Sequence, residues 1–202
     1  MKKIVLSLFS LAVIAGANAQ SGTVLVGGNV GVHTKNYVGT GNTTADGKTT
    51  QFEIAPTVGY QFNDNWTLGV TGGVGLSKTE PKGSNTVSKT SDFNVGPFVR
   101  YTAPVSDIFA IYGQLQGGYQ GYTDKTETTV GGATTTVKST GNGGYARLFP
   151  AVFINVKNNF GLNVDFGGVE FNSLKAKGAN KAANTFDFTF GRTFNIGISK
   201  NF

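Results

Sequence analysis

From residue 22 onward, apolar and polar side chains alternate along eight stretches of the chain. In the second stretch, for example, Phe52, Ile54 and Val58 are separated by Glu53 and Thr57. Alternation with a period of two predicts β-strands in a sheet whose two faces differ. The apolar stripes cover residues 24–32, 52–62, 66–76, 93–101, 109–119, 148–154, 160–166 and 190–202. The stripes average about ten residues, close to the length that a tilted strand needs to cross a bilayer.

The connections between these stretches alternate between short and long. The short ones cover residues 63–65, 104–107 and 157–159, and the long ones, rich in Thr, Gly, Asn and Lys, cover residues 35–50, 78–91, 123–142 and 175–183. Short turns on one side and long loops on the other are typical of transmembrane β-barrels. We therefore predict an all-β fold, an eight-stranded antiparallel up-and-down transmembrane barrel. We also expect no gap between the first and last strands, because an open edge in hydrocarbon leaves backbone groups unpaired.

Two observations indicate which face of the strands points outward. The polar face is mostly Gly, Thr, Asn, Gln and Ser, whereas a soluble, lipocalin-like barrel would have an apolar interior and an exterior dense in charge. Aromatic residues also gather near both ends of the stripes, as in the girdles of membrane barrels. We therefore expect the apolar face to contact lipid. The expected lipid-facing residues include Val58, Val70, Leu115, Val164 and Ile196.

The first nineteen residues differ from the rest of the chain. Lys2 and Lys3 form a basic start, residues 4–14 are a short apolar core, and residues 17–19 form a small-x-small cleavage motif. This order predicts a signal peptide at residues 1–19, cleaved between Ala19 and Gln20, followed by one barrel domain at residues 20–202. The chain has no cysteine, so disulfides and thiolate chemistry are excluded.

Several short motifs resemble those of known membrane barrels. Phe194, Ile196, Ile198 and Phe202 look like the last-strand signal that the barrel-assembly machinery recognises, although Lys200 stands where that signal often has an aromatic residue. Together with the segments 56–60 and 166–168, they make residues 20–202 similar to the small outer-membrane β-barrel, porin-like family of Gram-negative bacteria. The resemblance implies location in the cell outer membrane and insertion by the barrel-assembly machinery.

Few residues are candidates for chemistry. The charged residues expected to point into the lumen are Glu53, Arg100, Arg147, Asp165 and Asp187. They form either a selectivity lining or, as we favour, a structural network, because buried charges need partners and side chains nearly fill a barrel of this size. Arg192 and the lysines of the long loops are candidates for pairing with lipopolysaccharide phosphates, although solvated loop charge is the simpler interpretation. His33, the one histidine, has no serine beside it.

Four hypotheses for function follow from this pattern. We favour an integral outer-membrane protein that is not an enzyme and has a structural or surface-interaction role carried by four external loops. The alternatives are a small porin for ions or small solutes, a lipid-modifying enzyme using His33, and a lipocalin-like binder. We expect no cofactor, no metal and no nucleic acid, and lipid and lipopolysaccharide around a monomer. The scattered lysines of exported loops do not favour nucleic acid.

One repeated feature contradicts the rules of strand formation. Pro56, Pro97 and Pro150 each lie within an apolar stripe, about seven residues before a short connection, and a Gly-Gly pair follows each turn. Proline has no N–H and removes a bond from the ladder. We predict that the backbone yields at each proline, by a bulge, a bend or an unpaired carbonyl.

Overall fold

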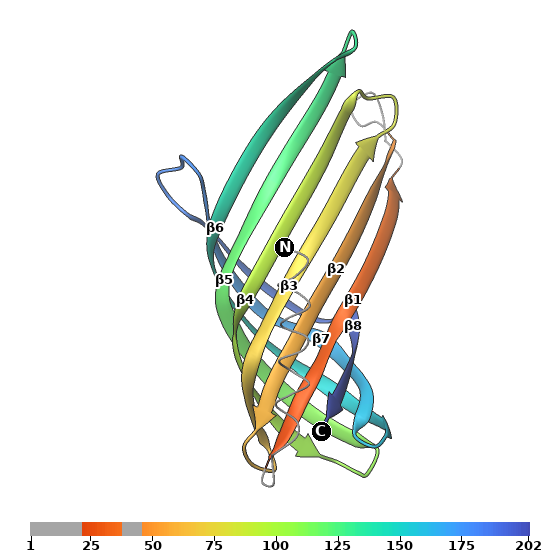
Figure 1. Ribbon diagram of the computed structural model, residues 1–202, viewed down its shortest axis with the longest axis vertical. Coiled ribbons are helices and arrows are strands. Elements are labelled where there is room, and N and C mark those ends of the chain that lie inside the picture. The colour runs from red at the N-terminus through yellow and green to blue at the C-terminus, as the bar shows by residue number, and fades with distance from the viewer. Residues whose placement is uncertain (1–21, 38–45) are drawn as a thin grey trace.

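The computed structural model describes residues 22–37 and 46–202 as eight antiparallel β-strands arranged in a ring (Figure 1). The strands are β1 (Thr23–Tyr37), β2 (Gly47–Gln61), β3 (Trp66–Pro81), β4 (Thr86–Pro104), β5 (Phe109–Val130), β6 (Ala133–Lys157), β7 (Phe160–Ala176) and β8 (Ala183–Asn201). Each strand pairs with the next, and β1 also pairs with β8. The predicted eight-stranded up-and-down barrel is therefore confirmed. None of the described residues belongs to a helix that is long and apolar enough to span a membrane.

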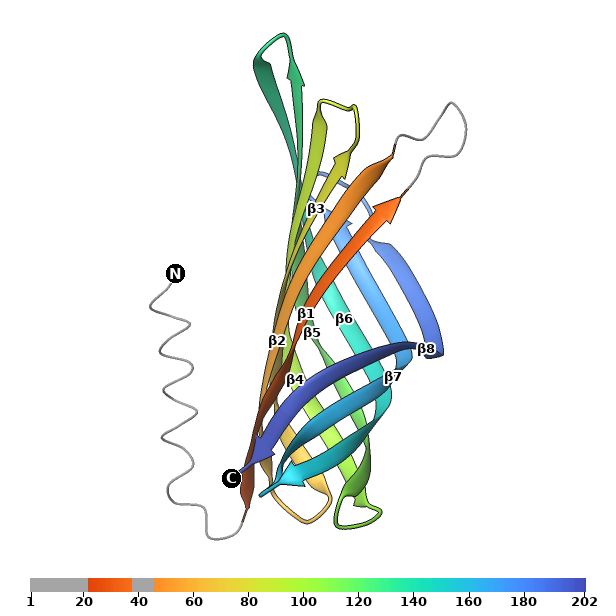
Figure 2. The same ribbon diagram turned by 90° about the vertical axis from the view of Figure 1, so that its right-hand side faces the viewer.

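The seam between β1 and β8 is short. Four residue pairs join these strands, and the last of them joins Gly28 to Ile198. At the other end of the seam, Val24 and Phe202 exchange two backbone hydrogen bonds of 3.1 and 3.0 Å. Beyond Gly28 no described residue of β1 pairs with β8, and Figure 2 shows the two strands separating. The expectation of a seam without a gap is wrong over this part of β1.

A bulge in β8 lies where the two strands part. Asp165 pairs with Asn195 and Gly167 pairs with Phe190, so β8 advances five residues while β7 advances two. Gly191 has a φ of 70° and Gly167 a φ of 92°, a region that glycine enters without a Cβ clash. Bulges bend a strand and increase its twist. The bend turns the first half of β8 away from β1, and this is why the seam is short.

The three short connections cover residues 62–65, 105–108 and 158–159, and together they define the turn end of the barrel. Side chains cap two of them. The Asn63 side-chain oxygen accepts hydrogen bonds from the N–H groups of Asn65 and Trp66. The Ser106 hydroxyl accepts them from Ile108 and Phe109. These caps let the chain reverse without leaving backbone donors unpaired.

At the opposite end, the loop end, two expected loops are strands instead. β3 and β4 are joined by residues 82–85 alone, and β5 and β6 by residues 131–132. The expectation of loops at 78–91 and 123–142 is therefore wrong for most of their length. Threonine favours strands and forms cross-strand pairs. Hydroxyl pairs join Thr49 to Thr79 and Thr86 to Thr128 at 3.1 Å each, so the sheet continues with polar side chains on both faces.

The apolar stripes lie on the outside of the ring, as predicted. Val58, Val70, Leu115 and Ile196 have exposed fractions between 40% and 62%, and Val164 is partly buried. Aromatic pairs mark the two edges of this apolar band. Trp66 and Tyr101 lie 5.0 Å apart, centroid to centroid, near the turn end, and Phe93 and Tyr119 lie 5.9 Å apart toward the loop end.

All three prolines interrupt a ladder, which confirms the prediction made for them. Each interruption lies between the strand that holds the proline and the next strand in the chain. The residues without a partner there are 55–56 in β2, 96–97 in β4 and 149–150 in β6. The register is unchanged across the first two gaps and shifts across the third. A bulge therefore occurs only at the third gap, where the extra residue lies in β7 opposite Pro150. Toward the preceding strand each proline keeps its partner.

The Gly-Gly pairs of the sequence repeat lie opposite these gaps, at 72–73, 117–118 and 167–168. At two of the gaps the strands approach so closely that a larger residue would clash. A Cβ on Gly118 would lie 2.6 Å from the Cα of Gly96, and a Cβ on Gly168 would lie 2.8 Å from the Cβ of Phe149. Glycine thus permits the close approach at these two prolines.

Candidate functional site in the barrel lumen

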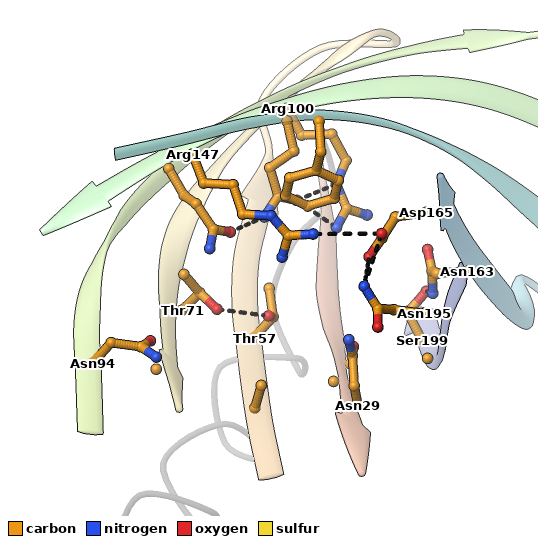
Figure 3. A pocket seen from close by; sticks show the side chains of 18 of the residues that line it. Asn29, Thr57, Thr71, Asn94, Arg100, Arg147, Asn163, Asp165, Asn195 and Ser199 are labelled. Atoms are coloured by element: carbon orange, nitrogen blue, oxygen red, sulfur yellow. Dashed lines mark hydrogen bonds and ion pairs between the residues drawn. The ribbon is translucent and has the colours of Figure 1, made fainter. Parts of the chain in front are cut away.

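Inward-facing side chains from all eight strands surround a cavity of about 240 Å³ (Figure 3). At about 30 Å³ per water molecule, this cavity has room for about eight waters. Most of its lining is polar, and the carboxylates, amides and guanidinium groups come from strands that are far apart in the sequence. The alternation that puts apolar side chains outside brings these groups together inside.

Arg100 of β4 is held without an ion pair. Its Nε and Nη2 atoms donate hydrogen bonds of 2.9 and 2.7 Å to the side-chain oxygen of Gln114. The amide nitrogen of Gln114 in turn donates to the side-chain oxygen of Gln116 at 2.8 Å. The guanidinium carbon lies 4.1 Å from the ring centroid of Tyr112 and 5.7 Å from that of Phe98. Among the described residues no carboxylate forms an ion pair with Arg100, so amide dipoles and aromatic faces stabilise its charge.

Arg147 of β6 joins two carboxylates of β7. Its Nη2 lies 3.4 Å from an oxygen of Asp165, and its Nε lies 3.9 Å from Glu170. Its guanidinium carbon also lies 4.5 Å from the centroid of the Phe149 ring. The long ion-pair distances, and a side chain that is 25% exposed, leave room for water around the guanidinium.

Asp165 is the most buried carboxylate of the cavity, with an exposed fraction of 6%. Besides Arg147, it accepts hydrogen bonds from the side-chain amide of Asn195 at 3.0 and 3.2 Å and from the backbone N–H of Gly167 at 3.3 Å. Asp165 and Asn195 face each other where the bulge of β8 begins. The carboxylate therefore connects three elements of the wall, which is what a structural role in the barrel requires.

The other residues singled out in the sequence are less involved. Glu53 lines the cavity but has no hydrogen bond or ion pair with a described residue. Asp187 lies opposite Glu170 in the register, yet it is exposed and is not part of the cavity lining. His33 is exposed on β1. The side chain of Arg192 lies outside the described residues, as do Ala19 and Gln20.

Three aromatic side chains that were not singled out from the sequence also point inward. Phe98, Tyr112 and Phe149 have exposed fractions of 2%, 4% and 7%, and Ala151 packs with the last two. Each aromatic residue stands next to an outward apolar residue in the sequence, so the period-two rule already assigned it to the lumen. Glu170 was overlooked as well. Between the pairs Ala151–Asp165 and Leu148–Val169, β7 advances four residues while β6 advances three, and this extra residue shifts the alternation before Glu170.

The side chains that line the cavity are mainly carboxylates, amides, guanidinium groups, hydroxyls and aromatic rings. The cavity lining contains no histidine, and the sequence has no cysteine. Within the described ranges, no three His, Cys, Asp or Glu side chains lie close enough together to hold a metal ion. The paired charges and the aromatic layer at the turn end are what a packed barrel interior requires.

Comparisons with known proteins place the chain in a family. A family model described as an outer membrane protein beta-barrel domain matches residues 4–202. No curated protein sequence matches the chain.

Solved structures of bacterial barrels are similar at low identity. Ail of Yersinia pestis is 14% identical, with 91% of this chain and 100% of that chain covered and a TM-score of 0.42. Neisserial surface protein A is 14% identical, with coverages of 92% and 99% and a TM-score of 0.39. A major outer membrane protein from Thermus thermophilus is 12% identical, with coverages of 91% and 100% and a TM-score of 0.45. Because the family model matches nearly the whole chain, this protein belongs to the outer membrane protein beta-barrel domain family and resides in the cell outer membrane.

Proposed function

We propose that this outer-membrane protein is not an enzyme and acts through its extracellular hairpins, in a structural or surface-interaction role. The observation that carries the proposal is the extension of the sheet beyond the apolar band. β5 and β6, of 22 and 25 residues, are the longest strands, and β5 continues from Tyr119, at the edge of the band, to Val130. Their outer parts are polar on both faces, as suits a sheet that stands in water and meets a partner.

Trimming the longest hairpin tests this role. Thr126 pairs with Val137, so replacing residues 127–136 by Asn-Gly removes the tip of the hairpin and leaves the membrane strands intact. Cells that lack the protein would be complemented with the full chain or the trimmed chain. We expect both chains to restore resistance to detergent if the role is structural, and only the full chain to restore adhesion if it is a surface interaction. Full activity of the trimmed chain in both assays would contradict the assignment to this hairpin.

The alternative of a small porin is less consistent with the packed lumen. Phe98, Tyr112 and Phe149 fill the turn-end half of the ring, and side chains nearly fill an eight-stranded barrel in general. We expect the refolded protein to show no single-channel conductance in planar bilayers. The variant Tyr112→Ala/Phe149→Ala should conduct if these rings block the path. Regular conductance steps from the unaltered protein would favour the porin.

Three further parts of the proposal concern export and assembly. We propose cleavage between Ala19 and Gln20, which the intact mass of protein purified from outer membranes would verify. The protein is proposed to be a monomer, measurable by light scattering with detergent correction. Recognition by the barrel-assembly machinery through Phe202 predicts that Phe202→Ala lowers the amount inserted in cells without changing refolding into pure lipid.

A further inference from the structure

Four lysines form a continuous row across the extracellular part of the sheet. Lys78 of β3 is directly opposite Lys89 of β4, Lys89 is opposite Lys125 of β5, and Lys125 is opposite Lys138 of β6. Directly opposed residues of antiparallel strands share one face, with Cβ atoms about 4.5–5.5 Å apart. We call these four residues the lysine row. They are far apart in the sequence, and only the register aligns them.

The lysine row lies on the outer face of the barrel, just beyond the apolar band. On each strand the lysine is an even number of residues from a large outward-facing apolar side chain, and so shares its face. Those side chains are Leu76, Phe93, Tyr119 and Leu148, all 46–52% exposed. The separation along the strand between each lysine and its apolar residue grows from β3 to β6. Because strands rise about 3.3 Å per residue and tilt by about 35–45°, the row climbs from the edge of the band at Lys78 outward to Lys138.

The row carries an excess of positive charge. Like charges directly opposite each other destabilise a sheet, and the row contains three such pairs in succession. Carboxylates compensate only part of this. Lys78 pairs with Glu80 and Lys89 with Glu127, at 2.7 Å each. Lys125 and Lys138 have no ion pair within the part of the chain that the structure describes. The protein alone therefore relieves only part of the repulsion.

We propose that the lysine row binds the phosphate groups of lipopolysaccharide in the outer leaflet. Ammonium groups bind phosphate through charge-assisted hydrogen bonds, and an anion between neighbouring lysines removes their repulsion. The slope of the row favours a glycolipid that carries phosphates at several heights above the membrane over a phospholipid, whose phosphates lie in one layer. The row is separate from the hairpin tips that carry the proposed surface interaction, so either proposal can fail alone.

Two variants with equal loss of charge test the site. The row variant is K78Q/K89Q/K125Q/K138Q. The control variant is K35Q/K157Q/K177Q/K181Q, which removes four exposed lysines that the register does not align with one another. Three of them lie in the other long loops, so the control also tests whether loop lysines outside the row bind lipopolysaccharide. Each protein would be refolded in zwitterionic micelles, and folding verified by the shift in gel mobility between heated and unheated samples. Binding of fluorescent lipopolysaccharide would then be titrated, with dephosphorylated lipopolysaccharide, phosphatidylglycerol and inorganic phosphate as competitors.

We expect the row variant to bind lipopolysaccharide at least about tenfold more weakly than the unaltered protein, and the control variant to change affinity by less than about twofold. Without lipid, the row variant should unfold at the same or a higher temperature, because the repulsive pairs are gone. Equal losses in both variants, or a less stable row variant, would overturn the proposal. Competition by phosphatidylglycerol or inorganic phosphate as strong as that by phosphorylated lipopolysaccharide would assign the row to another anion, and so would also overturn it.

Discussion

Replacement of Asp165 is the most direct perturbation of the lumen network. The Asp165→Ala variant removes the ion pair with Arg147 and the acceptor of the Asn195 amide and the Gly167 N–H. Asp165→Asn keeps the shape and part of the hydrogen bonding but removes the charge. We expect both variants to fold into the same barrel, because the apolar outer face and the turns are unchanged, and to be less stable than the unaltered protein.

The size of the loss follows from the geometry around Arg147. Removing one partner of a buried ion pair generally costs about 3–5 kcal/mol. Here the remaining guanidinium keeps Glu170 at 3.9 Å, and its side chain is 25% exposed, so its charge stays partly compensated. We therefore expect Asp165→Ala to lower the free energy of unfolding by about 2–3 kcal/mol, and Asp165→Asn by about 1–2 kcal/mol.

Equilibrium unfolding in urea, with the protein in phospholipid vesicles, measures these changes. Trp66 is the only tryptophan, and it lies on the outer face beside Tyr101, so its fluorescence reports whether the barrel is inserted. A double-mutant cycle with Arg147→Met isolates the pairwise contribution, which we expect at about 1–2 kcal/mol. Asp187→Asn is the matched control, because Asp187 is exposed and its change should stay within about 0.5 kcal/mol.

Two results would refute this reasoning. A loss below about 0.5 kcal/mol for Asp165→Ala would mean that the carboxylate does not stabilise the wall. A coupling energy near zero would mean that the 3.4 Å approach of Arg147 to Asp165 contributes nothing, and that the hydrogen bonds of Asn195 and Gly167 account for the whole effect.

Three further predictions concern other parts of the barrel. Gly118→Ala should destabilise the protein by about 1–3 kcal/mol through overpacking, whereas Gly113→Ala, with no atom within 4 Å of the added Cβ, should be tolerated in the same unfolding assay. The hydrogen bond from Lys89 lowers the pKa of Glu127, so the carboxyl should titrate by NMR below its usual range and move back up in Lys89→Gln. Any stabilisation from this pair is present above the usual pKa and is lost as the pH falls through the lowered one. Hydrogen exchange should be faster for edge amides of β1 beyond Gly28 than for those at the seam; equal protection would show that the strands pair farther.

Much of the fold is encoded locally and was predictable. The period-two alternation around Val58 and Leu115 predicted the strands and their outward faces, because side chains of a strand alternate between two environments whatever the strand pairs with. The turn residues predicted the tight reversals, and Pro56, Pro97 and Pro150 predicted the gaps in the ladders, because a missing N–H is a property of the residue itself. The polar hairpins were missed because neither of their faces is apolar, so they lack the signal that marks a membrane strand.

By itself, then, the sequence determined the number of strands, their order, the face that meets lipid and most of the charged residues that point inward. Only the tertiary structure decided which residues lie opposite one another. The contact of Arg147 with Asp165, the bulge that draws β8 away from β1 and the alignment of Lys78 with Lys138 all depend on the register between strands. Register is a cooperative outcome of pairing along whole strands, and a shift by one residue would change every such neighbour while leaving the local pattern the same.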